Sequence, residues 1–272
     1  MTVAIGTLSY AAAAAAYCFL SVLLVISWRG RLAGALLMLA SILTAVWAGV
    51  LAYQAANPAA TRLPGELLEI AHKGAWFLFL LVLLGYARHA SAPANRGLRR
   101  IALVILGACA AVMALAAALR IPADSPTLRE WRFLTSILAP GILALVGMLL
   151  VEHLYRNTNP EQRWSLKFLC LGLGAYFAFD FYLFSDAMLF RRLHPDIWSA
   201  RGVVAASIVP LIAVSAARNP TWSLDVAVSR QFVLHSTTLL AAAAYLLIMA
   251  TAGYYIRFFG GAWGGLLQVT FL

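Results

Sequence analysis

Residues 3–26 read VAIGTLSYAAAAAAYCFLSVLLVI, and no charged side chain interrupts them. A helix of about 20 apolar residues crosses the ~30 Å hydrocarbon core of a bilayer, because each residue adds ~1.5 Å. This stretch therefore predicts a transmembrane helix. The first basic residue, Arg29, comes after the stretch, so the basic start of a cleaved signal peptide is missing and the amino terminus is predicted to lie outside.

The rest of the chain has the same character. Apolar residues make up 63% of the 272 positions and charged residues 11%, which is too few charges to cover the surface of a soluble protein. The net charge of +10 does not indicate nucleic-acid binding, because the basic residues stand singly or in pairs between apolar runs. Cys18, Cys109 and Cys170 lie within apolar runs and lack metal-ligand or disulfide spacing. The composition predicts a polytopic membrane protein with the lipid bilayer as its partner.

The apolar runs divide the chain into an all-α bundle of eight complete transmembrane helices and the start of a ninth. The predicted spans are residues 3–26, 32–55, 67–87, 101–119, 133–151, 168–190, 197–217 and 232–255. A ninth run begins at Leu266 and has only seven residues up to Leu272, which is too short to cross a bilayer. We therefore expect residues 1–272 to form one membrane domain that is interrupted in its ninth helix. The loop holding Arg88, Arg96, Arg99 and Arg100 contains no acid and is predicted to be cytoplasmic.

Asp180 stands near the middle of the predicted sixth helix. An ionisable side chain at that depth costs a few kcal/mol or more unless it is paired, hydrated or neutral. Tyr176 lies one turn away on the same face, so its hydroxyl is expected to donate to the Asp180 carboxyl group. Two interpretations remain open: a hydrogen-bonded aspartate that locks two helices together, or a carboxylate that senses or couples a signal.

A second group of polar residues lies at the start of the predicted third helix. Glu69, His72 and Lys73 share one helix face, because they are spaced i, i+3 and i, i+4. They form either an interfacial salt bridge with an outward-reaching lysine or, with Asp186 and Arg201, a polar pocket open to the extracytoplasmic side. No catalytic residue is assigned, because the chain contains no Walker A, GxGxxG, GxSxG or HExxH motif. No cofactor or metal site is expected within it.

Several segments resemble the membrane region of PrsK-type histidine kinases, which belong to the PEP-CTERM/exosortase systems of exopolysaccharide-producing Gram-negative bacteria. The more specific segments lie in the carboxy-terminal part, and the similarity runs over essentially the whole chain. The similar segments are RNPTWSLDVAVSR (218–230), HSTT (235–238), GYYIRFFGGAWG (253–264), SWRGR (27–31) and GAWFLFL (74–80).

The resemblance implies a sensor module of a two-component system in the bacterial inner membrane. It also implies GAF-like, dimerisation, phosphoacceptor and ATP-binding domains after residue 272, so that ATP and Mg²⁺, homodimerisation and a PrsR-type response regulator belong to those domains. The signal does not follow from the resemblance. The alternatives are a self-contained transporter, an integral-membrane enzyme or a structural subunit. No internal repeat supports transport, and no nucleophile and base at useful spacing support an enzyme.

Overall fold

The computed structural model describes residues 2–28, 30–57, 59–88, 126–158 and 160–219, with isolated positions between 103 and 114. The chain divides into two compact units, Met1–Ala227 and Val228–Leu272, and all the described residues belong to the first. The predicted eighth span and the start of the ninth lie outside the described residues. The predicted fourth span, 101–119, is described at isolated positions only.

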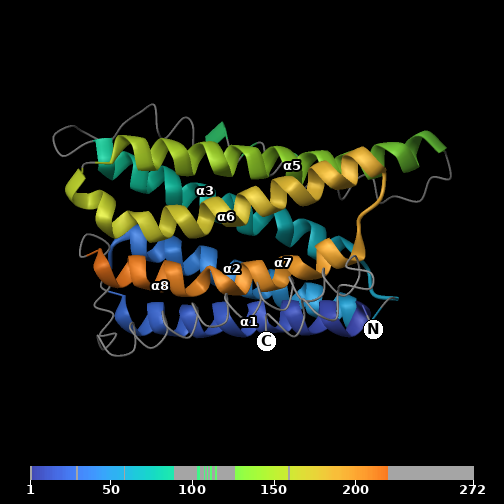
Figure 1. Ribbon diagram of the computed structural model, residues 1–272, viewed down its shortest axis with the longest axis horizontal. Helices are drawn as coiled ribbons and strands as arrows, with labels where there is room; N and C mark the ends of the chain where they lie inside the picture. Colours follow the sequence, from blue (N-terminus) through green and yellow to red (C-terminus); the bar gives the residue numbers. More distant parts are fainter. Residues whose placement is uncertain are drawn as a thin grey trace, which may run out of the picture. The chain divides into compact units, whose positions relative to one another are not determined.

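Every element assigned in the described part of the chain is a helix (Figure 1). The helices are α1 (Thr2–Ser27), α2 (Leu32–Ala56), α3 (Leu63–Arg88), α5 (Pro126–Asn157), α6 (Pro160–Phe190), α7 (Pro195–Ser207) and α8 (Val209–Arg218). Six stretches among the described residues are long and apolar enough to cross a membrane: Ile5–Ser27, Leu32–Ala56, Leu63–Gly85, Ser136–Asn157, Arg163–Phe190 and Pro195–Arg218. They correspond to the predicted first, second, third, fifth, sixth and seventh spans.

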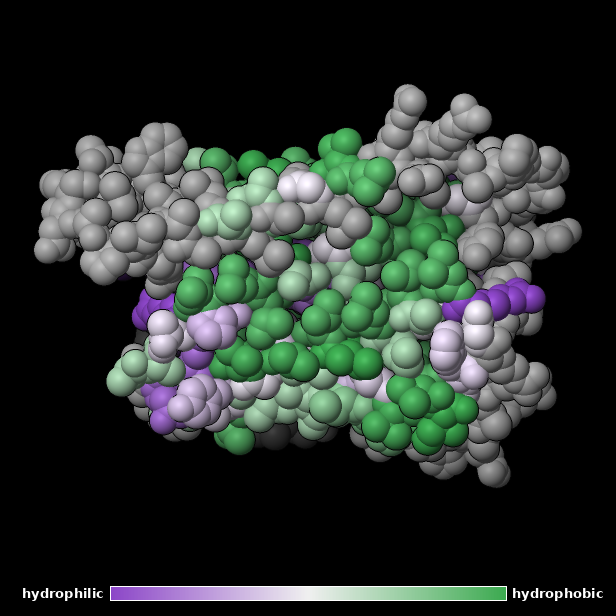
Figure 2. Space-filling model, turned by 180° about the vertical axis from the view of Figure 1, so that it is seen from behind, coloured by the Kyte–Doolittle hydropathy of each residue, from purple (hydrophilic) through white to green (hydrophobic). Residues whose placement is uncertain are grey.

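The surface of the described part supports a bilayer environment. Figure 2 shows hydrophobic side chains across the middle of the visible face and hydrophilic side chains near its two ends. Large apolar side chains such as Leu8, Ile26 and Leu189 are between 70% and 78% exposed. In water, a continuous apolar surface of this kind would drive association, whereas lipid chains solvate it. The helices therefore indicate a membrane protein.

The helices close a ring through their main contacts. α1 packs against α2 and α7, α3 packs against α2 and α5, and α6 packs against α5 and α8. The neighbours α1 and α7 run parallel, because Gly6 lies beside Ser199 and Ser9, three residues later, lies beside Gly202. The Tyr10 hydroxyl also donates to the Trp198 carbonyl at 2.8 Å. Side chains that point into the ring from several helices can therefore meet in its interior.

The contact between α1 and α7 depends on small residues. A Cβ atom on Gly202 would lie 2.5 Å from the carbonyl carbon of Ser9 and 2.7 Å from its oxygen. A Cβ atom on Gly6 would lie 3.1 Å from the Ser199 Oγ. Small residues let helix backbones approach closely in membranes, where packing replaces the hydrophobic effect as the driving force. The approach fixes the position of Arg201, the residue next to Gly202.

The predicted seventh span is locally interrupted. It consists of α7 and α8, which are separated at Ile208 (φ −83°, ψ −17°). Pro210 has no N–H to donate to the carbonyl of Ala206, and its ring crowds the preceding turn, so the regular hydrogen-bond ladder cannot continue through this point. The two helices nevertheless lie within one stretch, Pro195–Arg218, that is long enough to span a membrane.

Candidate functional site

Four charged side chains meet inside the ring. Glu69 and Lys73 come from α3, Asp180 from α6 and Arg201 from α7; we call these four residues the charge cluster. Lys73, Asp180 and Arg201 have no exposed surface, and Glu69 is 5% exposed. A buried charge is very costly unless it is paired and hydrogen-bonded. With two carboxylates and two cations, the charge cluster is formally neutral.

Arg201 lies between the two carboxylates. Its Nε donates to the Asp180 Oδ1 at 2.6 Å, and its Nη2 donates to the Asp180 Oδ2 at 2.7 Å. Nη1 donates to the Glu69 Oε2 at 2.7 Å, and Nη2 also donates to the Glu69 Oε1. The planar guanidinium thus makes two-point contacts with both acids, which a lysine ammonium cannot reproduce. Through this one side chain, α7 is bonded to α3 and α6.

Lys73 completes the charge cluster from the other side. Its ammonium lies 3.0 Å from the Glu69 Oε1, one turn earlier on the same helix, and 2.9 Å from the Asp180 Oδ2. It also donates to the Pro140 carbonyl at 3.2 Å, which brings α5 into the network. These three contacts match the three donors of an ammonium group. The predicted i, i+4 pair of Glu69 and Lys73 is present, but the lysine points into the ring and not toward the interface.

Aromatic side chains enclose the charges. The Trp47 indole N–H donates to the Glu69 Oε2 at 2.9 Å, and the Arg201 guanidinium carbon lies 4.7 Å from the centre of the Trp47 ring. The same carbon lies 5.4 Å from the centre of the Phe184 ring and 5.5 Å from that of Trp198. Cations are attracted to aromatic faces, most strongly where water is excluded. The rings therefore both shield the charge cluster and contribute to holding Arg201.

His72 and Tyr176 lie beside the charge cluster. The His72 Nδ1 is 2.8 Å from the Leu68 carbonyl, which can only accept, so Nδ1 carries a proton. The Nε2 of the neutral ring then accepts from the Tyr176 hydroxyl, 2.8 Å away. The predicted bond from Tyr176 to Asp180 is replaced by this one. The hydroxyl has a single proton to donate and His72 accepts it, while Arg201 and Lys73 donate to the oxygens of Asp180.

The charge cluster lies between the middle of the helices and one of their ends. Asp180 is ten residues before Phe190, the last residue of α6, or about 15 Å from that end. Arg201 is six residues after Pro195, the first residue of α7, or about 9 Å from the corresponding end. Because α6 begins at Pro160, eight residues before the predicted start at 168, its centre lies closer to the amino terminus than predicted. Asp180 consequently stands farther from the centre of its helix than the sequence suggested, although its distance from Phe190 is unchanged.

Asp186 does not join the charge cluster. It follows Asp180 by six residues, which turns its side chain about 120° away around α6. Its Oδ2 lies 3.9 Å from the His194 Nε2, beyond hydrogen-bond distance. The predicted group of Glu69, His72, Lys73, Asp186 and Arg201 is thus corrected: Asp180 takes the place expected for Asp186. The predicted open pocket is also corrected, because the charge cluster is enclosed.

Two hydrogen-bond partners of the charge cluster were not predicted. Trp47 and the Pro140 carbonyl both contact the charge cluster. A signal for Trp47 was available, because it stands in the middle of the second span, whereas most of the other tryptophans lie near predicted helix ends. A backbone carbonyl leaves no comparable signal in the sequence.

The chemistry of this arrangement favours coupling between helices over catalysis. Each carboxylate oxygen already accepts from at least one cation, so none is free to act as a general base without first breaking an ion pair. Within the described part of the chain, no group of three or more His, Cys, Asp or Glu side chains is arranged to hold a metal ion.

Comparisons with known protein families, curated proteins and solved structures found no match to this chain.

Proposed function

We propose that this chain is the membrane input region of a sensor histidine kinase similar to the PrsK type, and that the charge cluster couples a signal to the packing of its helices. The observation that most directly supports this proposal is that Arg201 on α7 donates hydrogen bonds to both Glu69 on α3 and Asp180 on α6. α7 continues through Ile208 into α8, which ends at Arg218 near the opposite ends of the helices. A displacement of Arg201 therefore has a direct structural path to the other side of the membrane.

The charge cluster has the properties of a two-state element. It is neutral and fully paired, so protonation or displacement of one carboxylate would leave an uncompensated positive charge in a medium of low dielectric constant. The helices would then have to move to restore pairing or to admit water. A signal shifts such an equilibrium only to the extent that it binds the two arrangements unequally. The interrupted ladder at Ile208 gives α7 a place at which to tilt relative to α8.

The remaining parts of the proposal follow from the resemblance to the PrsK type. The complete protein would carry GAF-like and kinase domains on the cytoplasmic side of a bacterial inner membrane. Those domains would bind ATP and Mg²⁺, form a homodimer and transfer phosphate to a PrsR-type response regulator. The regulated process would be PEP-CTERM/exosortase-dependent exopolysaccharide production.

The proposed orientation can be tested with reporters on either side of α6. Alkaline phosphatase, which is active only in the periplasm, is fused after Thr158, between α5 and α6, or after Arg192, between α6 and α7. With the amino terminus outside, we expect the Thr158 fusion to be inactive and the Arg192 fusion to be active. A fusion after Arg96 should behave like the one after Thr158. The reverse pattern of activity would contradict the orientation.

The proposed function predicts that Asp180→Asn changes kinase output. The complete gene product is reconstituted in proteoliposomes, and ATP-dependent autophosphorylation and transfer to a PrsR-type regulator are measured. Coupling free energies between distant sites are typically about 1–3 kcal/mol, so we expect the rate to change by about fivefold or more at equal amounts of folded protein. Asp186→Asn is the matched control, because Asp186 is on the same helix but outside the charge cluster.

The outcomes of this assay separate the two parts of the proposal. If the wild-type protein shows no ATP-dependent phosphorylation, the kinase assignment is wrong. If the wild-type protein is phosphorylated and the rates of the Asp180→Asn and Asp186→Asn variants are equal, the coupling role of the charge cluster is wrong and the kinase assignment stands.

A further inference from the structure

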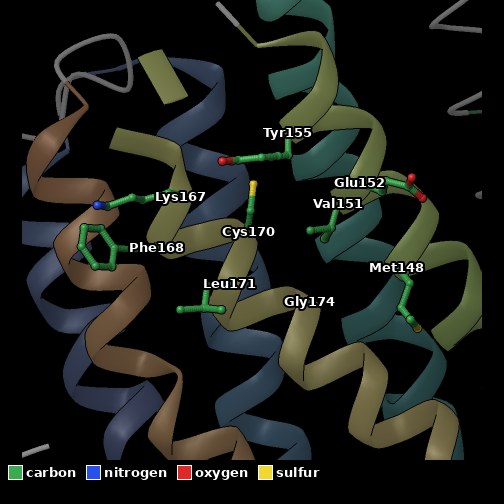
Figure 3. A pocket seen from close by; sticks show the side chains of 9 residues that line it. All are labelled: Met148, Val151, Glu152, Tyr155, Lys167, Phe168, Cys170, Leu171 and Gly174. Atoms are coloured by element: carbon green, nitrogen blue, oxygen red, sulfur yellow. The ribbon is translucent and has the colours of Figure 1, made fainter. Parts of the chain in front are cut away.

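A groove of about 600 Å³ opens between the second half of α5 and the first half of α6 (Figure 3). This volume lies within the range of sites that bind small molecules. The groove is separate from the charge cluster and is lined by Met148, Val151, Glu152, Tyr155, Lys167, Phe168, Cys170, Leu171 and Gly174. Leu171 and Tyr155 in this lining are 64% and 43% exposed, so the groove opens onto the surface of the described part, between two helices long enough to span a membrane.

Polarity changes along the length of the groove. Figure 3 shows Tyr155, Glu152 and Lys167 toward one end and Met148, Leu171 and Gly174 toward the other. The polar end lies near the last turn of α5 and the first turns of α6, while the apolar end lies deeper. A membrane phospholipid has the same order, with a charged headgroup at the interface and acyl chains below it.

Two cations lie beside the polar end: Lys167, which lines the groove, and Arg218, which contacts the ring of the lining residue Phe168. The Lys167 ammonium lies 3.2 Å from the centre of the Trp164 ring and 4.9 Å from that of Phe168. The Arg218 guanidinium carbon lies 5.6 Å and 5.0 Å from the same two rings. Neither cation has an ion-pair partner among the described residues. Two like charges held around shared rings at a helix end attract an anion.

Glu152 also lines the groove, but it does not pair with Lys167 or Arg218. Glu152 pairs with Arg156 on the same helix at 2.7 Å. Its charge is therefore balanced within α5, and among the described residues the charge left unpaired beside the groove is positive. An anionic headgroup is complementary to such a rim, whereas a zwitterionic one would bring its own cation toward Lys167 and Arg218.

We propose that the groove binds one anionic phospholipid from the leaflet at the Arg218 end of the helices. Its phosphate oxygens accept from Lys167 and Arg218, and an acyl chain lies along Val151, Leu171 and Gly174. Because Lys167 belongs to α6 and Arg218 to α8, the headgroup bridges the two helices. The proposal stands independently of the kinase assignment, since it needs only the membrane location.

Cys170 provides a native reporter for the test, because it lines the groove and is 8% exposed. In a Cys18→Ala, Cys109→Ala background, it is the only cysteine of the chain. The protein is reconstituted in phosphatidylcholine vesicles that contain or lack phosphatidylglycerol, and the rate of Cys170 alkylation by a lipid-soluble maleimide is measured. We expect phosphatidylglycerol to slow labelling, and native mass spectrometry to show it retained in preference to phosphatidylcholine.

Charge and shape variants sharpen the test. Lys167→Gln and Arg218→Gln should each reduce the preference for phosphatidylglycerol about fivefold, because each basic residue at an anionic membrane surface contributes about 1 kcal/mol, which is about a fivefold change in affinity. Gly174→Phe, which fills the apolar end, should reduce retention of either lipid. Arg192→Gln, an exposed cation at the other end of α6, is the matched control and should leave the preference unchanged.

Three results would overturn the proposal. The first is a labelling rate that does not depend on phosphatidylglycerol. The second is protection that survives in the Lys167→Gln, Arg218→Gln double variant. The third is protection in phosphatidylcholine alone that rises with the protein-to-lipid ratio, since this would show that a second copy of the chain occupies the groove.

Discussion

Replacing Arg201 with methionine is expected to lower the free energy of unfolding by about 3–5 kcal/mol, the range observed when one partner of a buried ion pair is removed. The variant leaves the carboxylates of Glu69 and Asp180 with Lys73 as their one remaining cation in the charge cluster, and therefore an uncompensated negative charge inside the ring. Methionine keeps much of the length and apolar contact of the arginine stem, so the loss reports mainly on charge and hydrogen bonding. Thermal unfolding in a single detergent, followed by tryptophan fluorescence, measures it.

A second substitution tests whether charge balance causes the loss. In the Arg201→Met, Glu69→Gln double variant, the pair of Lys73 and Asp180 remains and the charge cluster is neutral again. We expect this variant to be less destabilised than the sum of the two single variants, because residues in one ionic network are coupled by about 0.5–3 kcal/mol. If the single losses simply add, or if Arg201→Met melts with the wild type, the charge cluster does not hold the helices together.

Arg201→Lys separates charge from geometry. It keeps the positive charge, but an ammonium group cannot make two-point contacts with both carboxylates. We expect a stability between those of the wild type and Arg201→Met. Equal stability of the lysine variant and the wild type would show that the hydrogen-bond geometry around Asp180 and Glu69 contributes little.

The sequence predicts the helices well because hydrophobic length is a local property. The six spans visible in the structure match predicted apolar runs, and α5 extends past the predicted end at 151 to Asn157 because polar residues such as Glu152 and Arg156 continue the helix. The interruption at Ile208 was also accessible to sequence reasoning, since Pro210 cannot continue a helical ladder. We nevertheless predicted one continuous span over residues 197–217, without an interruption.

The charge cluster was predictable only in its parts. Helical spacing alone places Glu69 beside Lys73, and the cost of burying charge singles out Asp180. Which carboxylate meets Arg201 depends on how α6 and α7 are rotated toward each other, and this rotation is set by contacts between distant segments. The prediction selected Asp186 because it lies toward the same predicted side of the membrane as Arg201, Glu69, His72 and Lys73. The structure selects Asp180 because its side chain points into the ring.

The close approach of α1 and α7 at Gly202 is one of those distant contacts, and it yields the second prediction of a large effect. Gly202→Ala is expected to destabilise the protein by about 1–3 kcal/mol, the usual cost of overpacking a close interface. The added Cβ atom would lie 2.5 Å from the backbone carbonyl carbon of Ser9, so no change of side-chain rotamer can relieve the contact. The helices must separate instead, and Arg201, one residue earlier, must move with α7.

Gly49→Ala is the matched control for this prediction. Gly49 lies within α2, and a Cβ atom there would meet nothing within 4 Å. Alanine is favoured over glycine inside a helix by about 0.5–1 kcal/mol in water, so this variant should be as stable as the wild type or slightly more stable. Thermal unfolding in the same detergent compares the two alanine variants. Equal melting temperatures would contradict the close backbone contact, whereas a loss confined to Gly202→Ala would show that one added carbon where α7 meets α1 destabilises the packing of the helix that carries Arg201.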